Sequence, residues 1–450
     1  MDASNGANAT SSIGEIVDRI VELRRKPAPE NVVQLARHCL LDWIGVALAA
    51  ANDPVIEKLR GAVASSSNGF TLVGTRERTS LDAALLINGA AGHILDFDDV
   101  HAAVPGHVTV AIAPVVLTLA EVGKGTWNDL ITAFVAGYEG MCALSRLMGP
   151  AHPRKGFHAT ATMGTFGAAI AASSFMSASR TETLSAIAIA ATQAAGLRAA
   201  FGTPLKSIQV GRASVNGHLS ATLAMSGLSA PETVFSGIDG FALTHEGGPE
   251  QPHAAERGYF IPDTVFKYDA SCFVTHAPIE CARKARETMP IPFESVSKIE
   301  VRIHPHAERI CAIRYPKTFL QAKFSLHHTV AMTLLGISTG NLANFEDYIS
   351  DPDIESWRQK VELLYDGKVG ETASFVRVIL NDGAAKEFSC DSNKPETNLA
   401  LQEERLASKF MTLASPILGD DQASEICRTV LRCDRKASVG TLFSLLRPQG

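Results

Sequence analysis

Apolar residues recur along most of this chain at the spacing of helices that are buried on at least one face. Ile16, Val17, Ile20 and Val21 follow that spacing, and a longer apolar segment extends from Val32 to Ala50. The same pattern continues through much of the first 266 residues, in Leu81–Ala91, Val108–Ala120, Trp127–Leu147, Gly156–Ala169, Thr181–Ala195 and Ala213–Met225. The pattern predicts a large helical bundle.

The pattern changes near Phe266. Ile299, Val301 and Ile303 alternate with polar residues, which predicts a strand, and Ser374–Asp391 reads as a hairpin with an Asp-Gly turn. Lys323–Leu335 and Pro352–Leu364 look helical, and helical spacing returns from Leu399. We therefore predict a mainly α protein with a large all-α domain built from both chain ends and a smaller α+β lid domain. The expected division is a disordered tail (1–12), the first part of the all-helical domain (13–266), the α+β lid (267–396) and a returning helical segment (397–450).

Charge and cysteine usage exclude several classes of protein. The 450 residues carry a net charge of -6, which gives no basic field for nucleic acid or anionic lipid. The longest apolar run, Val108–Ala120, is too short to span a bilayer, and the first residues do not resemble a signal peptide. The eight cysteines form no Cys-x-x-Cys pair, so neither zinc nor an iron–sulfur cluster is indicated. We expect a cytoplasmic protein with no cofactor, whose thiols are mostly buried, with Cys272 as the exception.

The stretch Gly92–Pro114 concentrates ionisable groups between two apolar helices. It contains three aspartates and three histidines, namely Asp96, Asp98, Asp99, His93, His101 and His107. Apolar flanks on both sides indicate a buried corner, where charges must be paired. Asp42 also lies within an apolar helix and is expected to make a cap or an inter-helix hydrogen bond.

Further polar groups lie in loops or at helix starts framed by glycine or proline. His158 begins a helix of small residues, Lys206 and Arg212 lie where another helix starts, and Lys267 precedes His276. We predict that these groups share one cationic cleft whose carboxylate is Asp96; the alternative is four unrelated polar sites. Such a cleft suits a substrate with two or three carboxylates.

Three other functions are compatible with parts of the pattern. The Asp-Phe-Asp-Asp run occurs in helical terpene cyclases, but 6% aromatic residues are few for sheltering a carbocation. A metal site of His93, Asp96, Asp98 and His101 lacks an accompanying metal motif. A binding or scaffold protein would use the same groups as structural ion pairs.

These residues resemble the MmgE/PrpD family, which includes 2-methylcitrate dehydratases, cis-aconitate decarboxylases and iminodisuccinate epimerases. The resemblance rests on Gly92–Asp99 with Gly106-His107, on Gly156–His158, and on Lys206–Arg212, Lys267–His276 and Lys323–Leu326. It implies metal-independent chemistry, a homodimer, and an active site between domains. This sequence departs from the family at Val100, where Thr is frequent, at Val108-Thr109, where Pro-Ser is usual, and at His328, where Tyr is frequent.

The combined interpretation is a cofactor-independent lyase acting on a small polycarboxylate, with dehydration as the first choice and decarboxylation or epimerisation as alternatives. His107 or His158 is expected to be the general base, and Lys206 and Lys267 to bind carboxylates and stabilise an enolate-like intermediate. Asp96 would orient one of these cations, and His328 could protonate the leaving group. Asp98 and Asp99 are expected to be structural. Arg212, Cys272, His276 and Val100 are the expected substrate-binding residues.

Overall fold

A computed structural model describes residues 4–63, 65–123, 125–247, 258–289 and 292–449, with only the backbone described for 4–12, 65–68 and 123. The protein is mainly α-helical, as the sequence predicts. The chain divides into two compact units. Unit 1 comprises Met1–Phe266 and Glu396–Gly450, and unit 2 comprises Lys267–Pro395.

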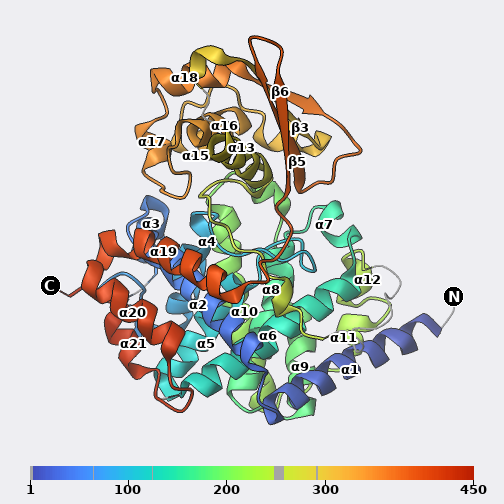
Figure 1. Ribbon diagram of the computed structural model, residues 1–450. Helices are drawn as coiled ribbons and strands as arrows, with labels where there is room; N and C mark the ends of the chain where they lie inside the picture. The colour runs from blue at the N-terminus through green and yellow to red at the C-terminus, as the bar shows by residue number, and fades with distance from the viewer. Residues whose placement is uncertain (1–3, 64, 124, 248–257, 290–291, 450) are drawn as a thin grey trace. The chain divides into compact units, whose positions relative to one another are not determined.

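Unit 1 is built from helices contributed by both ends of the chain (Figure 1). The long ones are α1 (Ser4–Arg25), α2 (Glu30–Ala49), α4 (Leu81–Ile94), α5 (Thr109–Gly123), α6 (Trp127–Met148), α8 (Ala159–Phe175), α9 (Arg180–Ala191), α10 (Leu205–Met225), α19 (Leu399–Leu418) and α20 (Asp420–Arg432). Shorter elements are α3 (Pro54–Ala62), α7 (Ala151–Lys155), α11 (Thr233–Ser236), α12 (Phe241–Thr244), α21 (Gly440–Leu445), and the 3-10 turns η1 (Arg198–Ala200) and η2 (Ile261–Asp263). A small antiparallel pair, β1 (Ser65–Thr71) and β2 (Arg78–Thr79), precedes α4.

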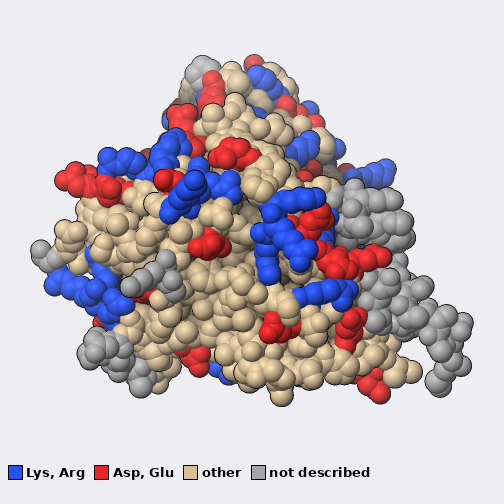
Figure 2. Space-filling view, turned by 90° about the horizontal axis from the view of Figure 1, so that it is seen from below, with Lys and Arg blue, Asp and Glu red and all other residues tan. Residues whose placement is uncertain are grey.

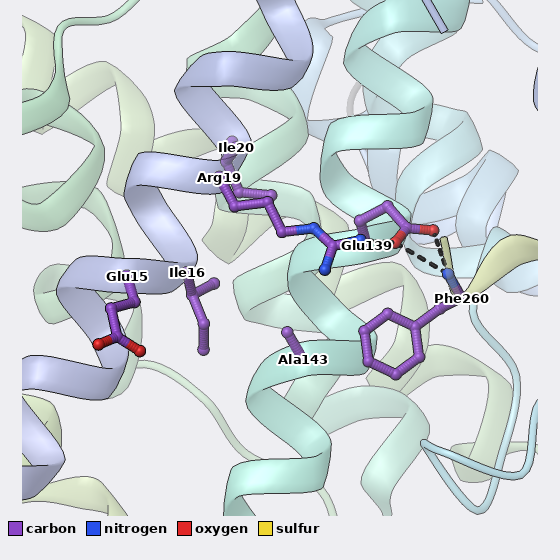
Figure 3. Close-up of a pocket in the computed structure, with 7 residues that line it drawn as sticks. All are labelled: Glu15, Ile16, Arg19, Ile20, Glu139, Ala143 and Phe260. Carbon is purple, nitrogen blue, oxygen red and sulfur yellow. Dashed lines mark hydrogen bonds and ion pairs between the residues drawn. The ribbon is translucent and has the colours of Figure 1, made fainter. Parts of the chain in front are cut away.

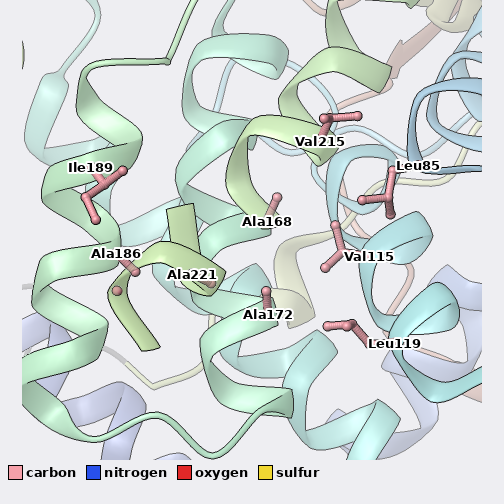
Figure 4. Close-up of a cluster of buried hydrophobic side chains, with 10 residues drawn as sticks. Leu85, Val115, Leu119, Ala168, Ala172, Ala186, Ile189, Val215 and Ala221 are labelled. Carbon is pink, nitrogen blue, oxygen red and sulfur yellow. The ribbon is translucent and has the colours of Figure 1, made fainter. Parts of the chain in front are cut away.

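Small side chains set the close packing in the middle of unit 1. One cluster joins α4, α5, α8, α9 and α10 through mainly alanine, valine and leucine (Figure 4). Helix α8 is buried over nearly its whole length, as expected for a helix of small residues. A methyl group on Gly211 would lie 2.2 Å from the carbonyl oxygen of Leu86, so α4 and α10 cross backbone to backbone. Because α10 carries Lys206 at its start, this crossing fixes one wall of the site described below.

An internal ion pair connects the two ends of the chain within unit 1. Lys409 on α19 places Nζ 2.6 Å from Asp42 Oδ1 on α2, and it also donates to the carbonyl of Phe97 at 2.7 Å. Both charged side chains are buried. The expected inter-helix contact of Asp42 is therefore confirmed, and the third partner, Phe97, lies in the aspartate-rich corner.

Unit 2 is a four-stranded sheet with helices. Its strand order is β4 (Val361–Tyr365), β3 (Val296–Ile303), β5 (Ala373–Leu380), β6 (Ala385–Asp391); β3 and β4 are parallel, and the other pairs are antiparallel. Helix α13 (His276–Thr288) packs on β5 and β6. The remaining helical pieces are η3 (Phe273–Thr275), η4 (Phe293–Ser295), η5 (Pro305–Ala307), α14 (Glu308–Cys311), α15 (Phe319–Lys323), α16 (Leu326–Leu335), α17 (Asn344–Asp347) and α18 (Pro352–Lys360).

The hairpin and the first strand of unit 2 are where the sequence predicts them, but three other predictions are wrong. The predicted helix 352–364 ends at Lys360, and Val361–Tyr365 forms β4 because it pairs with buried β3. The predicted helix 323–335 breaks at Ser325, whose side chain caps α16. The tail predicted for 1–12 is helical from Ser4, since extending the packed helix backward adds a hydrogen bond per residue; residues 1–3 lie outside the described part.

The surface charge and the apolar helix α2 both bear on function. On the face shown in Figure 2, lysine and arginine side chains are interspersed with acidic ones. Helix α2 is long and apolar enough to cross a membrane by length and composition alone. However, 83% of its most apolar window is buried inside the protein, as in a core helix.

Candidate active site

Asp96 lies at the turn that ends α4, in a backbone conformation that few side chains adopt. Its φ is +51°, and its N–H donates to the carbonyl of His93 at 3.0 Å. Glycine is the usual residue at such a helix end, although Asp tolerates the left-handed region. An aspartate held there is a local departure of the kind found at functional sites.

The Asp96 carboxylate connects a lysine and a histidine. Its Oδ1 accepts a hydrogen bond from Lys206 Nζ at 2.6 Å and lies 3.6 Å from His107 Nε2. The side chains of Asp96 and Lys206 are about one fifth exposed, at 18% and 19%. The pair is therefore within reach of solvent and of a small ligand.

Asp98 lies deeper and is shared by two imidazoles. Its Oδ2 is 2.9 Å from His93 Nδ1 and 3.0 Å from His107 Nδ1, and the two rings meet edge to face at 4.6 Å. Burial acts to raise the pKa of Asp98, but the two histidines outweigh it and hold that pKa well below its usual range. Burial lowers the pKa of His93 to about 4. A charged carboxylate thus supports the Nδ1 side of His107, which leaves Nε2 for proton transfer.

His158 stands at the N-cap of α8, as the sequence predicts. Its N–H donates to the carbonyl of Gly196 at 3.0 Å, and its ring stacks on His93 at 6.0 Å and meets the edge of Phe201 at 5.0 Å. Its Nδ1 lies 2.8 Å from Gln209 Nε2. Burial, reinforced by His93 and Lys206, lowers the pKa of His158 to about 2. The ring is therefore neutral at physiological pH.

Asp99 faces away from this group. It is buried, and its carboxylate accepts a hydrogen bond from Thr109 Oγ1 at the start of α5. Burial, together with Asp42 and Asp98, raises its pKa to about 7. Asp99 therefore contributes to the support of the corner, which agrees with the structural role expected for it.

The segment after residue 258 holds the corner in place. Val100 pairs its backbone with Val265, and His101 Nε2 contacts the carbonyl of Phe260 at 3.0 Å. The buried carboxylate of Glu139 on α6 in turn accepts a hydrogen bond from the backbone N–H of Phe260 (Figure 3). It accepts another from the backbone N–H of Ile261. Figure 3 also shows Arg19 reaching toward Glu139, whose carboxylate lies 3.5 Å away. Val100 and His101 thus have structural contacts in this loop.

The remaining predicted site residues lie in unit 2. Lys267 is buried, and His276 lies 3.9 Å from the Asp269 carboxylate. His328, on α16, is fully buried, and neither ring nitrogen has a hydrogen-bond partner among the described residues. Burial, reinforced by Arg358, lowers the pKa of His328 to about 4.

Three expectations need correction. Arg212 is exposed, because six positions after Lys206 amount to about 240° around a helix, so it does not join the buried group. Cys272 is no exception among the thiols, since it is buried in an apolar cluster with Ile303 and Leu326. The group in unit 1 holds two carboxylates and not Asp96 alone, because Asp98 contacts His107 directly.

The structure adds three residues to the unit 1 group that sequence reasoning missed. Gln209 contacts His158, Thr160 accepts a hydrogen bond from the N–H of His107 at 3.2 Å, and Phe201 lies beside both His158 and Lys206. Of these three residues, only Gln209 could have been predicted from the sequence. It follows Lys206 by three positions, which places both residues on the same side of a helix.

His93, Asp98 and His107 offer donor atoms within 4.8 Å of one another, as a metal site would. The Nδ1 atom of His93 is hydrogen-bonded to Asp98 Oδ2 at 2.9 Å, and Nδ1 of His107 lies 3.0 Å from the same oxygen as an ion-pair contact. The arrangement is that of a carboxylate bridging two imidazoles, and no step below requires a metal.

Fold and site together define a class: a mainly α-helical protein whose larger unit, built from both chain ends, holds a partly buried group of histidines, aspartates and a lysine. The chain belongs to the MmgE/PrpD family. Residues 14–253 match the MmgE/PrpD N-terminal domain, and residues 270–434 match the C-terminal domain.

Curated relatives match over most of their length at low identity. A cis-aconitate decarboxylase of Homo sapiens is 28% identical over 93% of this chain and 91% of its own. A cis-aconitate decarboxylase of Aspergillus terreus (strain NIH 2624 / FGSC A1156) is 25% identical over 98% and 97%, respectively. A 2-methylcitrate dehydratase of Escherichia coli (strain K12) is 24% identical over 79% and 77%.

Proposed function

We propose that this protein is a cofactor-independent lyase that acts on a small polycarboxylate by moving a proton at a carbon next to a carboxylate. The observation that carries the proposal is the contact of Asp96 with both Lys206 and His107, beside the buried Asp98. A lysine binds a substrate carboxylate, and an imidazole backed by a carboxylate exchanges a proton. The family supplies the substrate class.

The geometry supports a role for each of these residues. His107 exchanges the proton through Nε2 while the Asp98 carboxylate stabilises the imidazolium that forms. Lys206 stabilises the negative charge that develops on the substrate, and an incoming carboxylate shares or replaces Asp96 as its partner. Positioned acid–base groups contribute about 10²- to 10⁴-fold, so electrostatic stabilisation must supply the rest of a rate enhancement of about 10⁶-fold or more. Lys267 of unit 2 is proposed as a second carboxylate-binding cation.

Decarboxylation of a cis-aconitate-like acid is the first candidate reaction. The decarboxylases among the relatives match more than 90% of this chain, whereas the dehydratase matches 79%. This order reverses the one expected from the sequence. In decarboxylation, the electrons of the broken carbon–carbon bond form a new double bond, carbon dioxide leaves, and the enzyme places a proton on carbon.

Dehydration of a 2-methylcitrate-like acid is the second candidate, favoured by the named dehydratase. Here a base removes the proton next to the carboxylate, the electron pair forms the double bond, and the departing hydroxyl receives a proton to leave as water. Both reactions need the same lysine and one proton donor, and dehydration also needs a base.

Proton NMR of the purified protein in deuterated water, with cis-aconitate, 2-methylcitrate and an imino-dicarboxylate as separate substrates, tests the proposal. Gas release with a deuterated alkene product indicates decarboxylation, and an alkene formed from the hydroxy acid indicates dehydration. Exchange without net change indicates epimerisation. If no acid reacts or exchanges while the protein still binds these acids, a polycarboxylate-binding protein is the better description, and the proposed function fails.

A further inference from the structure

Gln209 occupies a position from which it can act on the candidate active site through His158. It lies in the first turns of α10, three residues after Lys206 and therefore on the same side of the helix. Its side chain reaches back to two groups at once: the backbone of Leu197 and the imidazole of His158.

The backbone of Leu197 fixes which end of the Gln209 amide is which. Oε1 accepts from the N–H of Leu197 at 2.9 Å, and Nε2 donates to the carbonyl of the same residue at 3.2 Å. Exchanging the two ends of the amide would put donor against donor and acceptor against acceptor. The second Nε2 proton is thereby directed at His158 Nδ1, 2.8 Å away.

The loop that presents Leu197 is itself tied to His158. Phe157 forms a backbone bridge with Leu197, and the carbonyl of Gly196 accepts from the N–H of His158. A displacement of the loop would therefore carry the histidine backbone with it. Gln209, Leu197 and His158 form a closed set of hydrogen bonds.

An imidazole nitrogen that accepts a hydrogen bond cannot carry a proton. We propose that Gln209 is a positioning residue that holds His158 as the neutral tautomer with its proton on Nε2, so that His158 donates a hydrogen bond through Nε2 and does not act as the base. The inference deepens the proposed function, on which its catalytic part rests.

The groups around His158 also disfavour a charged ring. His158 caps α8, and the positive end of a helix dipole opposes an imidazolium there. His93, Lys206 and His107 add to this effect, whereas Asp96 opposes it. With His158 as the donor, the role of base falls to His107, whose Nδ1 faces the Asp98 carboxylate.

The test is a long-range proton–nitrogen NMR correlation of histidine-labelled protein, assigned by comparison with His158→Gln. In the wild type, His158 should show a lone-pair Nδ1 and a protonated Nε2 from pH 5 to pH 8. In Gln209→Glu, the carboxylate accepts from the ring, so Nδ1 should become protonated. Turnover should then fall by about 10²- to 10³-fold in kcat, as for the loss of one preorganised hydrogen-bond donor, with a smaller change in KM.

Gln193→Glu is the matched control, because Gln193 also donates to a side chain, the hydroxyl of Ser220, but makes no contact with His158. It should keep the wild-type spectrum and turnover. A protonated Nδ1 in the wild type, or a Gln209→Glu variant with the wild-type tautomer and turnover, overturns the proposal. The spectrum is recorded without substrate, so failure of every acid to react counts against the proposed function and not against the tautomer.

Discussion

The buried carboxylate of Asp99 should make the wild-type protein less stable as the pH rises. Burial raises its pKa in the folded protein to about 7, from the ordinary value of 3.8 for an aspartate. Below pH 3.8 the carboxyl is protonated in both the folded and unfolded states. Between the two values only the folded state keeps the proton, so raising the pH favours unfolding; above pH 7 the full penalty is present.

The size of the effect follows from that difference in pKa. About three units at 1.36 kcal/mol each give a loss of about 4 kcal/mol in the free energy of unfolding between low pH and pH 8, of which about 3 kcal/mol falls between pH 5 and pH 8. Asp99→Asn keeps the shape of the side chain and cannot ionise. The variant should therefore gain stability over the wild type by that amount as the pH rises.

Urea unfolding followed by circular dichroism at pH 5, 6, 7 and 8 measures the difference. Asp239→Asn, at an exposed position, is the control and should differ from the wild type by an amount that does not change with pH. If the wild type and Asp99→Asn give parallel stability profiles from pH 5 to pH 8, Asp99 is already ionised at pH 5, and the reasoning is refuted.

Two further changes test how unit 1 supports the site. Lys409→Met should cost about 3–5 kcal/mol of unfolding free energy by leaving Asp42 buried without its lysine. The double variant with Asp42→Asn should recover most of that loss in the same urea assay. If the losses of unfolding free energy in the two single variants simply add in the double variant, the two residues are not coupled and this prediction is wrong. Gly211→Ala should cost about 1–3 kcal/mol because its methyl group would meet the Leu86 carbonyl, and wild-type stability would show that α10 can shift.

The helices of unit 1, the first strand and the hairpin of unit 2 could be predicted because their apolar periodicity is local. Strand β4 could not, since Val361–Tyr365 owes its conformation to pairing with β3, far away in the sequence. At the site, Asp96, His107, His158 and Lys206 could be singled out because their residue types suggest chemistry. Their partnerships could not be predicted, because the sequence does not show which oxygen faces which nitrogen.

Asp98 and Gln209 illustrate that limit. Asp98 is one of three neighbouring aspartates, and only the folded loop turns it toward His93 and His107 while Asp99 faces Thr109. Gln209 is an ordinary polar residue on a helix until the loop at Leu197 fixes its amide. Arg212 illustrates the opposite error. Its closeness to Lys206 in the sequence suggested a substrate-binding role, but the turn of the helix places it on another side.

The central claim is that the charge on Lys206 stabilises the substrate during proton transfer. Its most direct test is to measure kcat/KM of Lys206→Met with the acid that the wild type consumes. Lys155→Met is the control, because Lys155 is exposed and, among the described residues, forms an ion pair only with Glu246. We expect kcat/KM to fall by about 10²- to 10³-fold in Lys206→Met, as for removal of one preorganised electrostatic contact, and to stay unchanged in Lys155→Met. Wild-type kcat/KM in Lys206→Met would contradict it.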